Sequence, residues 1–182
     1  MNTYYPTTSV QRGMWPTWPL KTFFTILFFG PIIAPLFQAT GLPFIADTGA
    51  LAHNVLSLYI CPTPAKSYYL FAFPMAVCVR CWAATIGLWG GWFLFQHVTH
   101  RQHLSKSGHF FYQAIQTFLS WHWILRLSIT LLPFLLWVLE ITLWRTAPLT
   151  VLLFNGIQAG LMAGLFFCSI WPGLHIRKPT VQ

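Results

Sequence analysis

Three of the four cysteines in this 182-residue chain lie in one stretch, CPTPAKSYYLFAFPMAVCVRC, at residues 61–81. Cys61 opens the stretch, and Cys78 and Cys81 close it as a C-x-x-C pair. Cysteines at this spacing can bind a metal ion or a cluster, act as a redox pair, or form a structural disulfide. The choice depends on the compartment, because disulfides persist on the oxidising side of a membrane and are rare in the cytoplasm.

A closed tetrahedral metal site needs a fourth ligand. His53, eight residues before Cys61, is the nearest candidate, so the metal hypothesis uses His53, Cys61, Cys78 and Cys81. Cys168 is a poor candidate, since it lies near the end of the last apolar segment. A disulfide from Cys61 to either cysteine of the pair would instead close a loop of roughly 17 to 20 residues and contribute roughly 3 kcal/mol.

A second group of metal-ligating side chains lies in HVTHRQHLSKSGH, which holds His97, His100, His103 and His109. The spacing puts the first two on neighbouring positions of a helix. A solvated basic cap at the end of a membrane helix is favoured over a metal site here. Histidine at a membrane face can also ligate chlorophyll or haem, but nothing in this pattern is specific for a pigment.

Catalytic motifs are absent from the sequence. Asp47 and Glu140 are the only two acids, which nearly excludes paired-carboxylate chemistry, and no G-x-S-x-G, H-E-x-x-H or P-loop is present. The chain is therefore predicted to be non-enzymatic. Glu140 lies inside an apolar segment near its end, where Arg145 is the expected partner. Arg80 is expected to snorkel to the membrane surface from the start of its own segment.

The composition indicates an integral membrane protein. Charged residues make up 7% of the chain, against about 25% in a soluble protein. Hydrophobic residues make up 56%, including ten Trp and seventeen Phe, and a soluble fold of this size could not bury them. The ten Lys and Arg are assigned to helix ends that meet anionic lipid, and no nucleic-acid partner is predicted.

The apolar segments predict an all-α membrane bundle in a single domain, 1–182. A membrane helix needs roughly 20 apolar residues, and four segments qualify: about 20–41, 77–98, 123–143 and 149–171. Two shorter interfacial helices are also expected. One opens the cysteine-bearing outer segment 44–81, and the other precedes the third span. Their apolar positions are Leu51, Val55, Leu58 and Tyr59 in the first, and Phe110, Phe111, Ile115, Phe118 and Leu119 in the second.

Glycines recur every four residues in the last span, at Gly156, Gly160 and Gly164. Such G-x-x-x-G patterns let another helix approach closely. Packing within this protein's own bundle is favoured over dimerisation, and Gly87 and Gly91 on the second span offer a plausible partner surface.

The distribution of positive charge predicts the orientation. With four spans both termini share one side, which receives Arg12, Lys21, Arg101, Lys106, Arg126, Arg177 and Lys178; the other side receives Lys66, Arg80 and Arg145. The positive-inside rule then places both termini in the cytoplasm and the cysteine segment on the opposite, oxidising side. There, a disulfide or closely packed thiols are favoured over a metal or cluster site, and redox exchange is the least favoured of the three.

The stretch ICPTPAKSYYLFAFPMAVCVRCWAATIGLWGG resembles the signature of a family of small bacterial membrane proteins, domain of unknown function 2085. The matching residues are Cys61, Pro64, Lys66, Ser67, Tyr68, Cys78, Arg80, Cys81 and Gly87. The resemblance covers about residues 45–168 and is greatest to members from oxygenic photosynthetic bacteria. Pro62 and Ala83 depart from it, since many members have His and Gly there, and the loss of that His weakens the metal hypothesis.

The resemblance implies a multi-span membrane protein with cysteines on its outer face, and it supplies no established activity. It favours a non-enzymatic accessory or assembly subunit of a larger complex, in a thylakoid or plasma membrane, with the bilayer and other membrane subunits as partners. The alternative is a membrane thiol-redox or metal-binding protein that uses Cys61, Cys78 and Cys81. A transporter is a weaker third hypothesis.

Overall fold

The computed structural model describes residues 16–59, 61, 63–100, 106–144 and 146–171. This part of the chain is mostly helical, and its only strands form a short antiparallel hairpin. The elements are α1 (Trp18–Ala39), α2 (Pro43–Tyr59), the single 3-10 turn η1 (Pro64–Lys66), β1 (Tyr69–Leu70), β2 (Phe73–Pro74), α3 (Val79–His100), α4 (Lys106–Ser120), α5 (Trp123–Leu143) and α6 (Leu149–Ile170).

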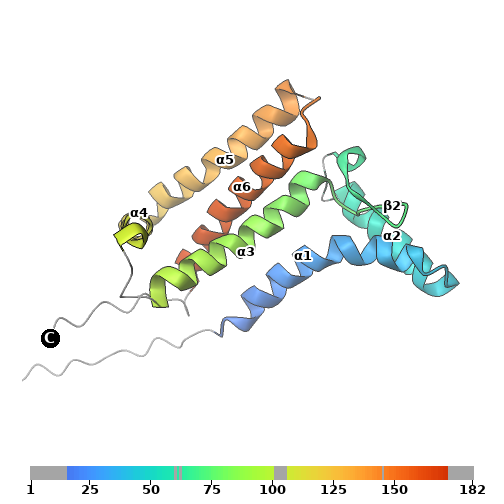
Figure 1. Ribbon diagram of the computed structural model, residues 1–182, viewed down its shortest axis with the longest axis horizontal. Helices are drawn as coiled ribbons and strands as arrows, with labels where there is room; N and C mark the ends of the chain where they lie inside the picture. The colour runs from blue at the N-terminus through green and yellow to red at the C-terminus, as the bar shows by residue number, and fades with distance from the viewer. Residues whose placement is uncertain (1–15, 60, 62, 101–105, 145, 172–182) are drawn as a thin grey trace, which may run out of the picture.

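The long helices lie side by side as a bundle (Figure 1). Helix α3 packs along most of α6, with α5 on the far side of α6 and α1 on the other side of α3. The first residues of α1 and the last residues of α6 lie at the same end, next to α4. Helix α2, the hairpin and the start of α3 lie at the opposite end. The cysteine segment is therefore far from the start of α1 and from the end of α6 (Figure 1).

Glycines set the distance between α3 and α6. A Cβ atom added at Gly91 would lie 2.7 Å from the carbonyl oxygen of Leu161 and 2.8 Å from the backbone nitrogen of Leu165. A Cβ atom at Gly164 would lie 2.6 Å from the carbonyl oxygen of Leu88. The two backbones therefore touch where their glycines face each other, as in other membrane helix pairs with small residues.

The apolar core lies toward the end of the bundle that carries α4. Phe24 of α1, Trp92 and Phe95 of α3, Phe118 of α4 and Cys168 of α6 are buried there together. Cys168 thus serves as a small apolar core residue, as free cysteines often do. It lies in a different cluster from the other three cysteines.

Three of the described helices are long and apolar enough to cross a membrane: α1, α5 and α6. Four spans were predicted, and the second of them, now α3, is not among the three. Helix α3 has 22 residues, the same number as α1 and α6. It is less apolar because it faces α6 with glycines and carries Arg80, Gln96 and His97. The two shorter predicted helices are present as α2 and α4.

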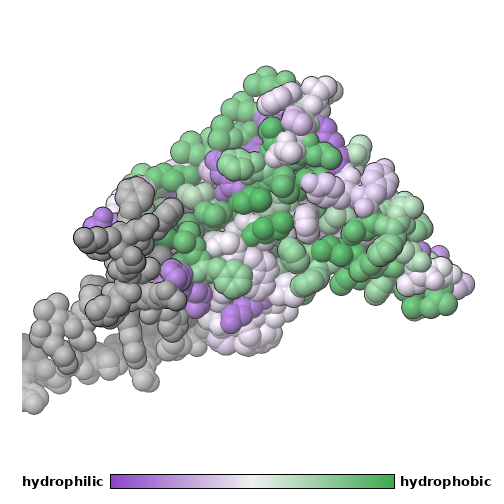
Figure 2. All heavy atoms as spheres, viewed as in Figure 1, coloured by the Kyte–Doolittle hydropathy of each residue, from purple (hydrophilic) through white to green (hydrophobic). Residues whose placement is uncertain are grey.

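Helices α5 and α6 leave many large apolar side chains exposed. Leu132, Leu135 and Leu139 of α5 and Phe154 of α6 are each at least half exposed, and Figure 2 shows hydrophobic residues over much of the visible surface. Such a surface is stable in hydrocarbon and costly in water. The exposed apolar surface therefore supports contact with a lipid bilayer.

Candidate functional site

Contacts at both ends hold the cysteine segment against the bundle. Pro35 has no N–H, so the carbonyl of Pro31 receives no bond from within α1. The backbone N–H of Ala76 donates to that carbonyl at 3.4 Å. Near the start of the segment, Nζ of Lys66 donates to the carbonyl of Ala147, in the α5–α6 connection, at 3.3 Å. A proline in a span thus becomes the attachment point for the segment that carries the cysteines.

Helix α3 places Cys78 and Cys81 side by side. The carbonyl of Cys78 accepts the N–H of Trp82 at 3.1 Å, so Cys78 immediately precedes the first turn and Cys81 ends that turn. Residues three apart lie on the same face of a helix, and the two Sγ atoms are 3.4 Å apart. The N–H of Cys78 donates to Sγ of Cys61 at 3.1 Å. All three sulfur atoms lie within 4.8 Å of one another.

Of the two forms of the favoured prediction, the structure has closely packed thiols and not a disulfide. All four cysteines lie in the described part of the chain, and each is a free thiol. A disulfide would need sulfur atoms about 2.05 Å apart, whereas those of Cys78 and Cys81 lie 3.4 Å apart. The three sulfurs instead meet as a group, because the C-x-x-C spacing and the bond from Cys78 to Cys61 converge on one point.

The three thiols are unequal in acidity. The pKa of Cys78 is lowered, because its side chain hydrogen-bonds first with Cys61, then with Cys81, and also with the backbone N–H of Cys81. The pKa of Cys61 is raised, mainly because its thiol donates to Cys78, with burial adding to the effect. A negative charge at the start of α3 is also favoured by the helix dipole. The first proton is therefore lost most readily at Cys78.

A single metal ion fits the three sulfurs. With a metal–sulfur distance of about 2.3 Å, sulfur ligands lie about 3.8 Å apart in a tetrahedral site and about 4.0 Å apart in a trigonal one. The observed spread, with every pair within 4.8 Å, needs only small side-chain rotations. Cys61 and Cys78 are buried, Cys81 is half-buried, and Leu56, Val77 and Trp82 surround them. The setting is largely buried and its three ligand atoms are all sulfur, which suits a soft or borderline metal.

His53 is not within the group of three sulfurs. It lies on α2, three residues before Leu56, which packs against the cysteines. Its Nδ1 atom is buried and has no hydrogen-bond partner among the described residues. Helix α2 is held at its present distance by Gly49, where a Cβ atom would lie 2.7 Å from the carbonyl oxygen of Ala34. Of the predicted four-ligand set, only the three cysteines therefore meet, and His53 lies one turn along α2 from Leu56 with its Nδ1 atom unpaired in the described part of the chain.

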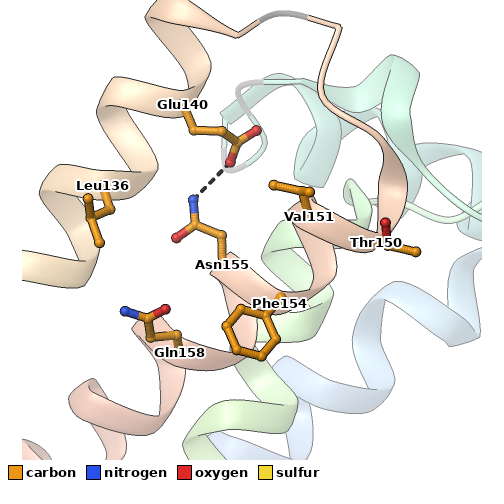
Figure 3. Close-up of a pocket in the computed structure, with 7 residues that line it drawn as sticks. All are labelled: Leu136, Glu140, Thr150, Val151, Phe154, Asn155 and Gln158. Atoms are coloured by element: carbon orange, nitrogen blue, oxygen red, sulfur yellow. Dashed lines mark hydrogen bonds between the residues drawn. The ribbon is translucent and has the colours of Figure 1, made fainter.

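Arg80, between the two cysteines of the pair, lies on the opposite side of α3 and is buried, contrary to the prediction that it snorkels. Its Nη2 atom donates to Oε1 of Glu140 on α5. The guanidinium carbon also lies 5.8 Å from the centre of the Trp137 ring. Nδ2 of Asn155 on α6 donates to Oε2 of Glu140 at 2.9 Å (Figure 3). The ion pair and this hydrogen bond together join three helices.

The predicted partner of Glu140, Arg145, lies outside the described residues. Sequence reasoning overlooked Arg80 because it was assigned to the surface. The signal was nonetheless available, since Arg80 lies at the start of one predicted span and Glu140 near the end of another, at the same end of the bundle. Charges at matching depth in a membrane usually pair.

The remaining predicted residues fall into two groups. Gly87 and Gly91 lie against α6, and Gly156, Gly160 and Gly164 lie against α3. The histidines form no group in the described part: His97 is exposed, His103 lies outside it, and the side chains of His100 and His109 are not described. Among the described side chains, no group of metal ligands meets at the histidine-rich end.

Comparison with known proteins gave one family. A family model described as "Predicted membrane protein (DUF2085)" matches residues 61–166, more than half of the chain. The match begins at Cys61 and ends within α6, so it includes the three cysteines, Arg80, Glu140 and the facing glycines. No curated protein and no solved structure matches the chain. The resemblance seen in the sequence is confirmed for the family, and its photosynthetic branch is untested.

Proposed function

This chain belongs to the DUF2085 family of predicted membrane proteins, and we propose that it binds a soft or borderline metal ion, Zn²⁺ or Cu⁺, through Cys61, Cys78 and Cys81. The observation that carries the proposal is the meeting of three free thiols within 4.8 Å at one end of a helical membrane bundle. Thiolates are the ligands that select Zn²⁺ and Cu⁺ over harder cations.

The acidity of the thiols supports this proposal. Metal binding requires thiolates and releases protons, and Cys78 has a lowered pKa. The metal would then be held first at Cys78 and closed in by Cys61 and Cys81. The fourth position is open to an outside ligand or to His53, whose Nδ1 atom is buried without a partner in the described structure. Three ligands and an open position suit exchange of the ion better than permanent structural binding.

The test is metal binding by the full chain, purified in mild detergent under reducing conditions. Wild-type protein should bind one equivalent of Zn²⁺ or Cu⁺, and Cys61→Ser, Cys78→Ser and Cys81→Ser should each lower the affinity at least about tenfold. Cys168→Ser is the matched control, because it is also a buried cysteine but lies in the other apolar cluster. A wild-type protein whose thiols all titrate but which binds neither ion would refute the proposal.

A second candidate is the accessory or assembly subunit, of a photosynthetic complex in a thylakoid or plasma membrane. It is supported by the apolar face of α2, where Leu51, Val55 and Leu58 are exposed although Gly49 packs tightly on α1. Such a face is typical of a helix that meets another subunit. Affinity purification of the chain from native membranes in mild detergent should recover a stoichiometric partner, and a chain that always migrates alone would count against this role.

We further propose that α3 is a fourth span and that both termini are cytoplasmic. The support is that α3 lies along α6 with its backbone in contact at Gly91 and Gly164, so α3 shares the depth of an apolar helix (Figure 1). The charge distribution then puts the cysteine segment outside. A fluorescent-protein fusion at the C-terminus should be fluorescent and an alkaline-phosphatase fusion inactive; the reverse pattern would overturn this orientation.

A further inference from the structure

An open groove follows the seam between α5 and α6 and consists of two adjoining hollows. The first, of about 470 Å³, lies toward the end that carries the cysteine segment and is lined in part by Glu140, Asn155, Thr150 and Gln158. The second, of about 530 Å³, is lined almost wholly by apolar side chains such as Leu132. Phe154 and Gln158 line both hollows, so the two form one continuous groove.

The polar hollow is unusual for a surface that faces lipid. Glu140 reaches toward α6 and Asn155 reaches toward α5, and Gln158 lies one turn further along α6 (Figure 3). Figure 2 shows hydrophilic residues set among the hydrophobic surface of these helices. Polar side chains exposed to hydrocarbon are costly, and they usually mark a site of function.

The charges in this hollow are already balanced. The carboxylate of Glu140 is paired with Arg80 and also accepts the bond from Asn155. Among the described residues that line the hollow there is no lysine or arginine, so a phosphate headgroup would meet a carboxylate and no cation from this lining. The groups that remain for a ligand are the amides of Asn155 and Gln158 and the hydroxyl of Thr150. Each of these offers both a donor and an acceptor, which is also what every hydroxyl of a ligand offers.

We infer that this groove binds a membrane lipid with an uncharged, sugar-bearing headgroup. The sugar hydroxyls exchange hydrogen bonds with Asn155, Gln158 and Thr150, while a hydrocarbon chain lies in the apolar hollow beside Leu132. The headgroup then sits at the same end of the bundle as the cysteine segment (Figure 1). This binding is independent of the metal site, which lies on the other side of α3 from Arg80.

Lipid competition tests the inference on the full chain. The protein is purified in detergent and incubated with equal amounts of a glycosyldiacylglycerol and a phosphatidylglycerol that carry the same acyl chains, and retained lipid is measured by native mass spectrometry. The glycolipid should be retained at least about fivefold in excess. Gln158→Leu and Thr150→Val should each reduce that preference to near one. A preference for the phospholipid, or an unchanged preference in both variants, would overturn the inference.

Two controls separate the groove from general surface effects. Thr142→Val removes an exposed hydroxyl of α5 that bonds only to carbonyls of its own helix and does not line the groove, and it should leave the preference intact. Leu132→Trp fills the apolar hollow and should lower retention of both lipids several-fold. Leu131→Trp changes an exposed neighbour that does not line the groove, so it should leave the retention of both lipids unchanged. Equal losses of retention in the two Trp variants would exclude the groove as the binding site.

Discussion

Gly91→Ala tests whether the contact between α3 and α6 holds the bundle together. The added methyl carbon would lie 2.7 Å from the carbonyl oxygen of Leu161, 2.8 Å from the nitrogen of Leu165 and 3.0 Å from the carbonyl carbon of Gly164. Ordinary contacts of a Cβ atom begin at 3.4 Å, so the helices must separate locally by about 3.4 − 2.7 = 0.7 Å. All three atoms belong to the backbone, so no side chain can rotate away.

The expected loss in the free energy of unfolding of Gly91→Ala comes from overpacking of the contact between α3 and α6. Inserting one methyl group into a closely packed contact costs about 1–3 kcal/mol. Separation along the seam also loosens the contacts on either side of Gly91, which places Gly91→Ala in the upper half of that range. Gly90→Ala is the matched control on the same helix, because its nearest neighbour is Cδ1 of Leu161 at 3.9 Å. It should change the free energy of unfolding by no more than about 0.5 kcal/mol.

Both variants can be compared with the wild-type protein by reversible unfolding in mixed micelles of rising denaturing-detergent content. Tryptophan fluorescence is a direct probe, since Trp89 and Trp92 lie on α3 beside the seam. Gly91→Ala should unfold at a lower denaturing-detergent fraction than Gly90→Ala. Equal stability of the two variants, with both eluting as monodisperse particles, would refute the account of the seam as a backbone contact.

Two further predictions concern the buried charges and the thiols. Glu140→Leu should cost about 3–5 kcal/mol in the same assay, because it leaves Arg80 buried and unpaired; the double variant with Arg80→Leu should regain much of this, and a double variant as unstable as Glu140→Leu alone would argue against the pairing. In reduced, metal-free protein, Cys78 should form its thiolate at a lower pH than an ordinary thiol, since hydrogen bonds from Cys61 and Cys81 lower its pKa below the usual 9.0. That charge, and the stability it confers, should disappear as the pH falls through the pKa of the folded state. The thiolate absorbance missing in Cys78→Ser measures it, and a signal that emerges only near pH 9 would contradict the lowered pKa.

The sequence was sufficient to predict the membrane class, the helices and the glycine positions that lie between α3 and α6. Composition alone excluded a soluble fold, and runs of about 20 apolar residues located α1, α5 and α6 to within two residues at their ends. These properties are local or nearly so. A helix forms in hydrocarbon because each backbone group must be bonded within its own segment, and that requirement can be read along the chain.

The candidate sites required the tertiary structure. The sequence grouped Cys61 with Cys78 and Cys81 but left a disulfide and closely packed thiols as alternatives, and it assigned Arg80 to the membrane surface. The sulfurs meet as three thiols because the N–H of Cys78 bonds to Sγ of Cys61, and Arg80 is buried because Glu140 of α5 faces it.

What the sequence by itself determined was therefore which segments are apolar enough to enter a bilayer and where their small residues lie, since hydropathy and spacing are properties of single segments. Only the tertiary structure decided which polar groups meet: Arg80 with Glu140, and Cys61 with the pair that opens α3. The physical reason is that these partners lie 60 and 17 residues apart, and helix packing, set by backbone contact at the glycines, fixes the depth and rotation at which each side chain arrives.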